Sequence, residues 1–172
     1  MTGSGSMSLI IAAAQSTSVP GDVARNVAHH LRFGTIAAER GAQLLVFPEL
    51  SLTGYELTIA RSNAVRPDSP DLDPLRHLAT HAHMTMVVGA PMLNDQDELH
   101  IAAFAIRPDG SVLTYTKEYV HQSEEGVFKS GPGGPALLVE DALLRWRSAR
   151  MQRTRSTRQA LRRAEPMSMR SV

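Results

Sequence analysis

The chain contains no cysteine among its 172 residues. Disulfide bonds and thiolate metal sites are therefore excluded, and cysteine usage says nothing about the redox compartment. A membrane-spanning run is also missing, because the apolar stretch from Leu9 to Ala14 is too short to cross a bilayer and follows no basic segment. Neither a transmembrane helix nor a secretory signal is predicted, and we expect a cytoplasmic protein with no membrane partner.

Acidic residues are scarce at the C-terminal end. Residues 143–172 contain nine of the 18 Lys and Arg residues, all of them arginine, but one of the 17 Asp and Glu residues. Apolar residues are too few there to form a stripe wide enough to bury, so we expect this tail to be disordered or to form a marginal helix. We therefore predict three parts: a flexible leader over 1–7, one domain over 8–142 and an arginine-rich tail over 143–172.

The order of apolar runs and turn signals indicates the fold class. Residues 8–15 are expected to form a strand buried on both faces, and Asp22 is placed to cap a helix that follows it. Pro108-Asp109-Gly110 is typical of a hairpin turn. The expected strands are 8–15, 42–47, 85–90, 99–106 and 111–115, and the expected helices are 23–41 and 75–82. Strands that alternate with helices and end in a hairpin predict an α/β fold, with a mixed sheet flanked by helices.

Three segments place charged side chains next to these strands. Phe47-Pro48-Glu49-Leu50, followed by Thr53-Gly54-Tyr55, puts Glu49 just past a strand that Pro48 should end. Lys117 follows a strand of the hairpin, and an acidic pair at 124–125 leads to Gly131. Each of these charges alone is typical of a solvated surface residue. Their ordered combination is the informative feature.

The combination resembles the nitrilase superfamily, also called the carbon-nitrogen hydrolases. The resemblance also includes Gln15 at the end of the first strand and Asn26 in the first helix, and it covers nearly all of residues 8–142. It implies an α-β-β-α sandwich, of which this chain would form the N-terminal half. It further implies a small amide, carbamoyl or nitrile substrate, no metal or organic cofactor, and a homo-oligomer.

The resemblance also assigns roles to three residues. Glu49 would be the general base, Lys117 would stabilise the oxyanion of a tetrahedral intermediate, and Glu125 would hold Lys117 and the substrate in position. Glu125 is preferred to Glu124 because its distances to Phe128 and Gly131 fit the pattern. The charged ends of Glu49, Lys117 and Glu125 should then converge in space.

The nucleophile of the family is missing. The family attacks its substrate with a cysteine thiolate that follows a strand roughly thirty residues after the lysine. That position falls near Ser148, which is surrounded by arginines and has no buried strand ahead of it. Serine is therefore a poor replacement, and we expect the chain to be catalytically inactive.

A frameshift near residue 142 would explain the missing cysteine. Back-translation of Leu143 to Gln152 permits a shifted frame that reads Val-Ala-Leu-Ala-Ile-Cys-Ala-Asp, an apolar strand followed by cysteine. Most of these codons are selected from several synonymous codons, whereas Trp146 and Met151 have one codon each. The sequence of the gene tests this hypothesis.

Other patterns suggest rival functions. His77, His81 and His83 could suggest a metal site, but no nearby carboxylate completes a known zinc spacing, so we expect no metal. The arginine tail could bind nucleic acid through phosphate contacts, although without a recognisable module we expect no specific recognition. A third possibility is a non-catalytic partner that associates with intact homologues.

Overall fold

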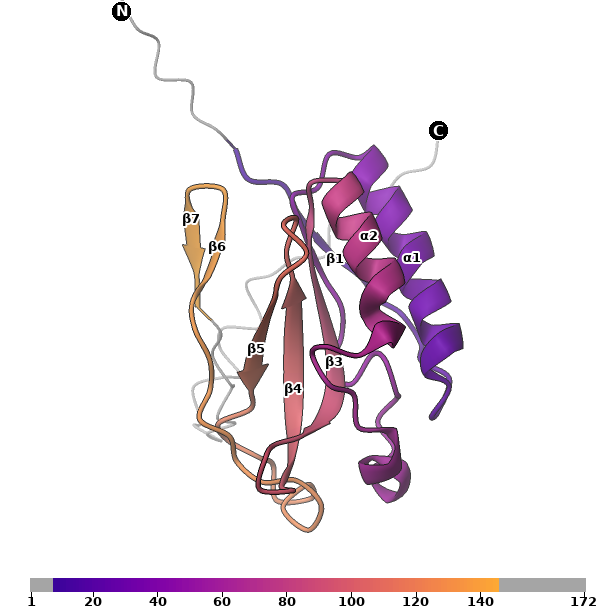
Figure 1. Ribbon diagram of the computed structural model, residues 1–172, viewed down its shortest axis with the longest axis vertical. Coiled ribbons are helices and arrows are strands. Elements are labelled where there is room, and N and C mark those ends of the chain that lie inside the picture. The colour runs from indigo at the N-terminus through magenta and orange to yellow at the C-terminus, as the bar shows by residue number, and fades with distance from the viewer. Residues whose placement is uncertain (1–7, 146–172) are drawn as a thin grey trace, which may run out of the picture.

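The computed structural model describes residues 8–145. Its main sheet has five strands in the order β1-β2-β3-β4-β5 (Figure 1). The strands are β1 (Ile11–Ala13), β2 (Leu44–Val46), β3 (Thr85–Leu93), β4 (Leu99–Ile106) and β5 (Val112–Thr116). β1, β2 and β3 are parallel, whereas β4 is antiparallel to both β3 and β5. The sheet is therefore mixed.

Two helices, α1 (Val23–Glu39) and α2 (Asp73–His81), lie against one face of this sheet (Figure 1). α1 begins where the Asp22 carboxylate accepts a hydrogen bond from the backbone N–H of Arg25 at 3.0 Å, which satisfies one of the unpaired amides of the first turn. Three short 3-10 turns precede α2: Leu57–Ile59, Arg61–Asn63 and Pro70–Leu72. Side chains such as Leu75, Met86 and Phe104 fill the space between helices and sheet.

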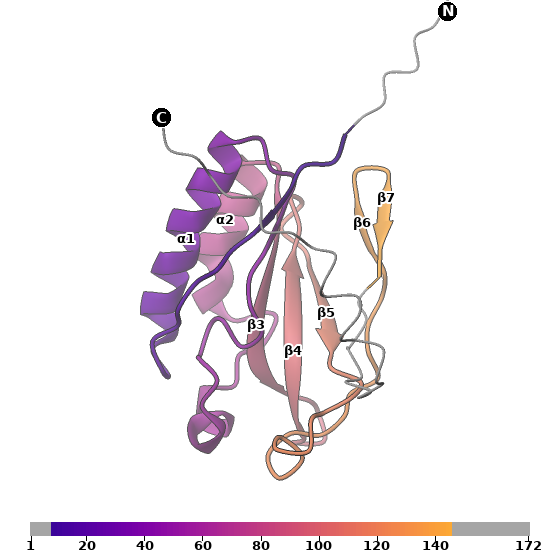
Figure 2. The same cartoon turned by 180° about the vertical axis from the view of Figure 1, so that it is seen from behind.

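A second hairpin, β6 (Leu137–Val139) and β7 (Ala142–Leu144), lies on the opposite side of the sheet from the helices (Figures 1 and 2). Leu137 and Val139 pack there against Leu44, Val87 and Ala105. These sheet residues alternate with the ones that face the helices, as the two-residue repeat of a strand requires. The hairpin thus covers part of a face that the helices leave open.

Most of the expected elements are confirmed, and the Asp22 cap is among them. The expectation that the first strand is buried on both faces was wrong. Among residues 8–145, β1 is an edge strand of the sheet, and Ile10 and Ile11 are 47% and 52% exposed. The β6–β7 hairpin was not predicted, and it carries regular structure past residue 142, where we expected the domain to end.

The predictions for residues 1–7 and for most of the arginine tail, including Ser148, lie outside the described residues. Within residues 8–145, neither helix has the length and apolar character needed to cross a membrane.

The strand directions bring two predicted residues to one edge of the sheet. β5 runs antiparallel to β4, which runs antiparallel to β3, so β2 and β5 end on the same side. Glu49 and Lys117 follow those two ends.

Candidate active site

Lys117 is at the centre of the candidate site. Its backbone is anchored between two neighbouring segments, because its N–H donates to the Ile101 carbonyl and its own carbonyl accepts from the Gly131 N–H, both at 2.8 Å. Its ammonium donates to Glu49 Oε1 at 2.8 Å and to Glu124 Oε2 at 3.0 Å. One cation therefore lies between two carboxylates that are 68 and seven residues away in the sequence.

Glu124 is the more enclosed of the two carboxylates. Its side chain is 4% exposed, whereas the side chain of Glu49 is 46% exposed. Besides Lys117, the phenol of Tyr55 donates to Glu124 Oε1 and the backbone N–H of His121 donates to Oε2, both at 2.8 Å. A carboxylate that accepts from three donors is held as an anion in one orientation. We call Glu49, Lys117, Glu124 and Tyr55 the Lys117 cluster.

The ionisation of the cluster follows from these contacts. Burial by itself would raise the pKa of Glu124, but the hydrogen bonds from His121, Lys117 and Tyr55 outweigh it and lower that pKa. Burial would likewise lower the pKa of Lys117, yet the hydrogen bonds and charges of Glu49 and Glu124 raise it. Burial and the bond to Glu124 raise the pKa of Tyr55. At neutral pH Glu124 is therefore an anion, Lys117 a cation and Tyr55 a neutral donor.

The predicted convergence holds for Glu49 and Lys117 but was wrong for Glu125. Glu125 is exposed, and Glu124 occupies the position against Lys117. The reason is the local turn, in which the Phe128 N–H donates to the Glu124 carbonyl at 2.8 Å. Residues four apart in such a turn share a side, so the buried ring of Phe128 and the Glu124 carboxylate face inward together and Glu125 faces solvent.

Sequence reasoning also missed the part played by Tyr55. The Thr53-Gly54-Tyr55 motif was recognised, but its spacing gave no indication that the phenol would reach across 69 residues to Glu124. Such a contact depends on how the turn after β2 folds against the segment after β5. No local sequence signal encodes that approach.

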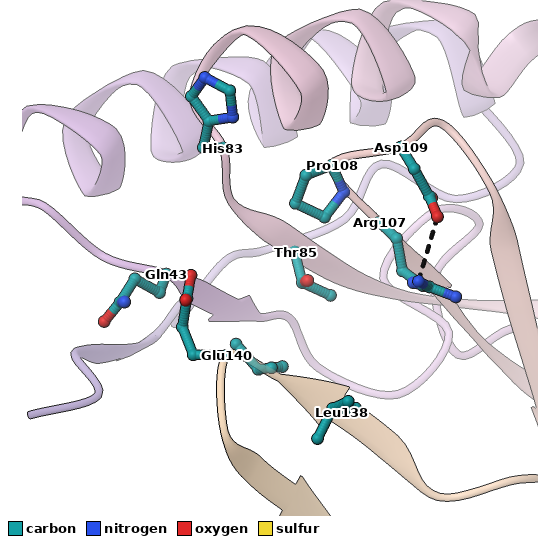
Figure 3. A pocket seen from close by; sticks show the side chains of 9 residues that line it. Gln43, His83, Thr85, Arg107, Pro108, Asp109, Leu138 and Glu140 are labelled. Atoms are coloured by element: carbon teal, nitrogen blue, oxygen red, sulfur yellow. Dashed lines mark ion pairs between the residues drawn. The ribbon is translucent and has the colours of Figure 1, made fainter. Parts of the chain in front are cut away.

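A cavity of about 220 Å³ lies at the other end of the sheet, among residues that precede β2 and β3 and follow β4 (Figure 3). It is lined by Gln43, His83, Thr85, Arg107, Pro108, Asp109, Leu138, Val139 and Glu140. Arg107 and Asp109 form an ion pair at 3.0 Å within this wall, so their charges are already matched. This cavity is separate from the Lys117 cluster.

The histidines considered as metal ligands do not form a site. Within residues 8–145, no group of three or more His, Asp or Glu side chains has a geometry that could hold a metal ion. His77 is exposed on α2, and His83 lies beyond the end of that helix in a left-handed conformation with φ of 49°. These histidines therefore lie at the surface of the helix and of the turn after it.

Comparison with known proteins identifies the family. The model of the carbon-nitrogen hydrolase family matches residues 10–140. The chain belongs to this family. An arylacetonitrilase from Hypocrea virens is 28% identical to it over 120 residues, which are 63% of this chain and 36% of that enzyme.

Solved structures of family members agree in fold. An amidase from Nesterenkonia sp. is 28% identical with a TM-score of 0.65, over 76% of this chain and 51% of the amidase. A structure of the NitN amidase from strain AN1 is 26% identical with a TM-score of 0.70, over 80% of this chain and 56% of that chain. A CN-hydrolase superfamily protein from Xanthomonas campestris, at 17% identity and a TM-score of 0.70, shares the fold.

Two facts distinguish this family member from those relatives. It spans about a third of the arylacetonitrilase and about half of the Nesterenkonia amidase chains. The Nesterenkonia amidase has an active-site cysteine that acrylamide modifies, whereas this chain has no cysteine.

Proposed function

We propose that the Lys117 cluster is the acid-base and electrostatic part of a hydrolase site for non-peptide carbon-nitrogen bonds in a small amide, carbamoyl or nitrile substrate. The observation that carries the proposal is the position of the Lys117 ammonium between Glu49 and Glu124, at 2.8 and 3.0 Å. A fixed cation at the edge of a sheet can stabilise negative charge that develops on a carbonyl oxygen or nitrile nitrogen. The family of the chain supports the same substrate class.

The two carboxylates have different roles in this proposal. Glu124 accepts from three donors and has a lowered pKa, so it stays ionised and fixes Lys117. Glu49 is half exposed, and solvent or a ligand can reach its carboxylate. Proton transfer therefore belongs to Glu49, and orientation of Lys117 belongs to Glu124.

The lack of cysteine limits what this chain does with a substrate. In the family the thiolate forms the covalent bond to the substrate carbon, and no other residue of the Lys117 cluster is a nucleophile of that kind. We therefore propose that the chain binds its ligand without turnover. The corresponding full family site would add the thiolate to the same base and cation.

A binding assay and a turnover assay on the full chain test the two halves of this proposal. We expect butyramide, acrylamide or phenylacetonitrile to perturb the NMR signals of Lys117 and Glu124, and we expect none of them to be hydrolysed. Perturbation of the Glu124 signals should disappear in Lys117→Ala and persist in Glu125→Gln, whose side chain lies outside the cluster. Absence of binding by the whole panel would reject the substrate class, and hydrolysis that vanishes in Glu49→Gln would reject inactivity.

A further inference from the structure

Behind Glu49 lies a buried histidine that the proposed chemistry does not use. We propose that His30 of α1, as the neutral tautomer protonated on Nδ1, is a positioning residue that fixes Glu49 through the hydroxyl of Ser51. This role rests on the proposed function, because Glu49 is taken as a carboxylate of the site. What is added is a chain of hydrogen bonds that runs from helix α1, through the turn after β2, to strand β3.

The contacts of His30 determine its tautomer. The side chain is buried, and Nδ1 lies 2.6 Å from the backbone carbonyl oxygen of Asn26, which can only accept a hydrogen bond. Nδ1 therefore carries the proton. Desolvation is the main cause that lowers the pKa of His30 to about 4, so the ring is neutral at neutral pH and Nε2 keeps a lone pair.

That lone pair accepts from Ser51. Ser51 Oγ lies 3.0 Å from His30 Nε2 and itself accepts from the backbone N–H of Gly89 at 3.2 Å. The serine hydroxyl is thus a donor to the histidine and an acceptor from β3, and its direction is fixed by the tautomer. The imidazole also stacks on Phe47 with ring centroids 3.9 Å apart, two residues before Glu49.

The turn that carries Glu49 needs such support. Leu50, directly after Glu49, has φ of 56°, a left-handed conformation that costs a non-glycine residue free energy. The turn also packs against β3 so closely that a Cβ on Gly89 would lie 2.5 Å from the Leu50 nitrogen. Backbone in this conformation persists only when its surroundings hold it there.

A second α1 residue holds the far end of the same turn. The buried amide of Asn26 donates to the Leu52 carbonyl at 2.9 Å and to the Val19 carbonyl at 2.8 Å, and its oxygen accepts from the Val19 N–H. The Asn26 side chain thereby binds the backbone of Val19, which precedes α1, and the backbone of Leu52, which follows it. His30 is the α1 side chain that reaches Ser51, two residues from Glu49.

NMR of the full chain tests the inference without relying on catalysis. Lys117 and Lys129 are the two lysines of the chain, so the titration of Lys117 can be followed with Lys129 as an internal control. Because Glu49 helps raise the pKa of Lys117, displacement of Glu49 in His30→Leu should lower that pKa toward its ordinary value. Ser51→Ala, which leaves the stacked ring intact, should have the same effect, and the double variant should go no further.

Three results would overturn the inference: a proton on Nε2 in the long-range ¹H–¹⁵N spectrum of wild-type His30, an unchanged Lys117 pKa in both single variants, or additive shifts in the double variant. His77→Leu, a histidine change on the exposed face of α2, is the matched control and should leave Lys117 unchanged. Loss of global stability alone does not alter a pKa measured in the folded state, so the readout separates positioning from folding. Failure of amide binding would count against the proposed function and leave this result standing.

Discussion

At the scale of single residues, two adjacent glutamates have different environments. Glu124 is buried and accepts from Lys117, Tyr55 and the His121 backbone, whereas Glu125 is exposed. The two glutamates are adjacent in the sequence, and the motif spacing favoured Glu125, which does not contact Lys117 in the structure. Burial and hydrogen bonding, which depend on the turn, decide which carboxylate belongs to the site.

Substitution of these two glutamates should therefore have unequal effects. In Glu124→Gln the fixed anion is lost and one acceptor oxygen becomes an NH₂ donor facing other donors, so we expect a loss of about 1–3 kcal/mol in the free energy of unfolding. Glu125→Gln should stay within about 0.5 kcal/mol of wild type. Urea unfolding of both variants checks this, and equal effects would contradict the assignment of Glu124.

His30 should make stability depend on pH in a defined window. Its pKa is about 4 in the folded chain against 6.5 for the ordinary group, so between these values the unfolded chain binds more protons. Stability contributed by the neutral ring is complete above pH 6.5 and is lost as the pH falls toward 4, by about 3 kcal/mol in total.

Comparison with a variant that lacks His30 isolates this contribution. The difference in unfolding free energy between wild type and His30→Gln should change between pH 7 and pH 4.5, because only wild type contains the His30 imidazole. The carboxylates titrate in both proteins, so their contribution cancels in the difference. His77→Gln, at an exposed position, should show no such change. A pH-independent difference for His30→Gln would mean that the imidazole is not held neutral.

At the scale of elements, the turn after β2 replaces what would otherwise be a longer strand. The Leu52 N–H donates to the Gly89 carbonyl at 2.9 Å, and the Gly89 N–H donates to Ser51 Oγ, so β3 continues to pair with the turn where β2 has ended. Pro48 made the end of the strand predictable. The approach of the turn to Gly89 was not predictable, because it depends on residues about 40 positions away.

The close approach at Gly89 can be tested by one methyl group. A Cβ there would meet backbone atoms of Leu50 and Pro48 at 2.5 and 3.0 Å, so Gly89→Ala should destabilise the fold by about 1–3 kcal/mol and shift the NMR signals of Glu49. Gly126→Ala is the matched control, since nothing lies within 4 Å of its added Cβ. Equal melting temperatures for the two variants would contradict the packing described here.

At the scale of the whole molecule, one sheet edge and part of one face are exposed. Within residues 8–145, β1 pairs with β2 and has no strand on its other side. The β6–β7 hairpin covers Leu44 on β2 but leaves Ile11, its neighbour on β1, 52% exposed. Exposed strand edges with apolar side chains favour pairing between chains.

We therefore expect concentration-dependent association through β1. Ile11→Lys places a charge on this edge and should shift sedimentation profiles toward monomer. Ile36→Lys provides the control, because Ile36 is 46% exposed but lies on helix α1. If both variants reduce association equally, general surface apolarity rather than the strand edge is responsible, and a wild-type chain that stays monomeric at all concentrations would reject the expectation.

The sequence by itself determined the order of the main strands and helices, since apolar periodicity, the Asp22 cap and the Pro108-Asp109-Gly110 turn are local signals. It also determined the family, because the Glu49 motif and the Lys117 motif follow one another in the order that is characteristic of that family. Only the tertiary structure decided that Glu124 rather than Glu125 meets Lys117, that Tyr55 joins them, and that β1 is exposed. Those outcomes depend on contacts between segments that are far apart in the chain. Local sequence patterns do not indicate which distant segments come into contact.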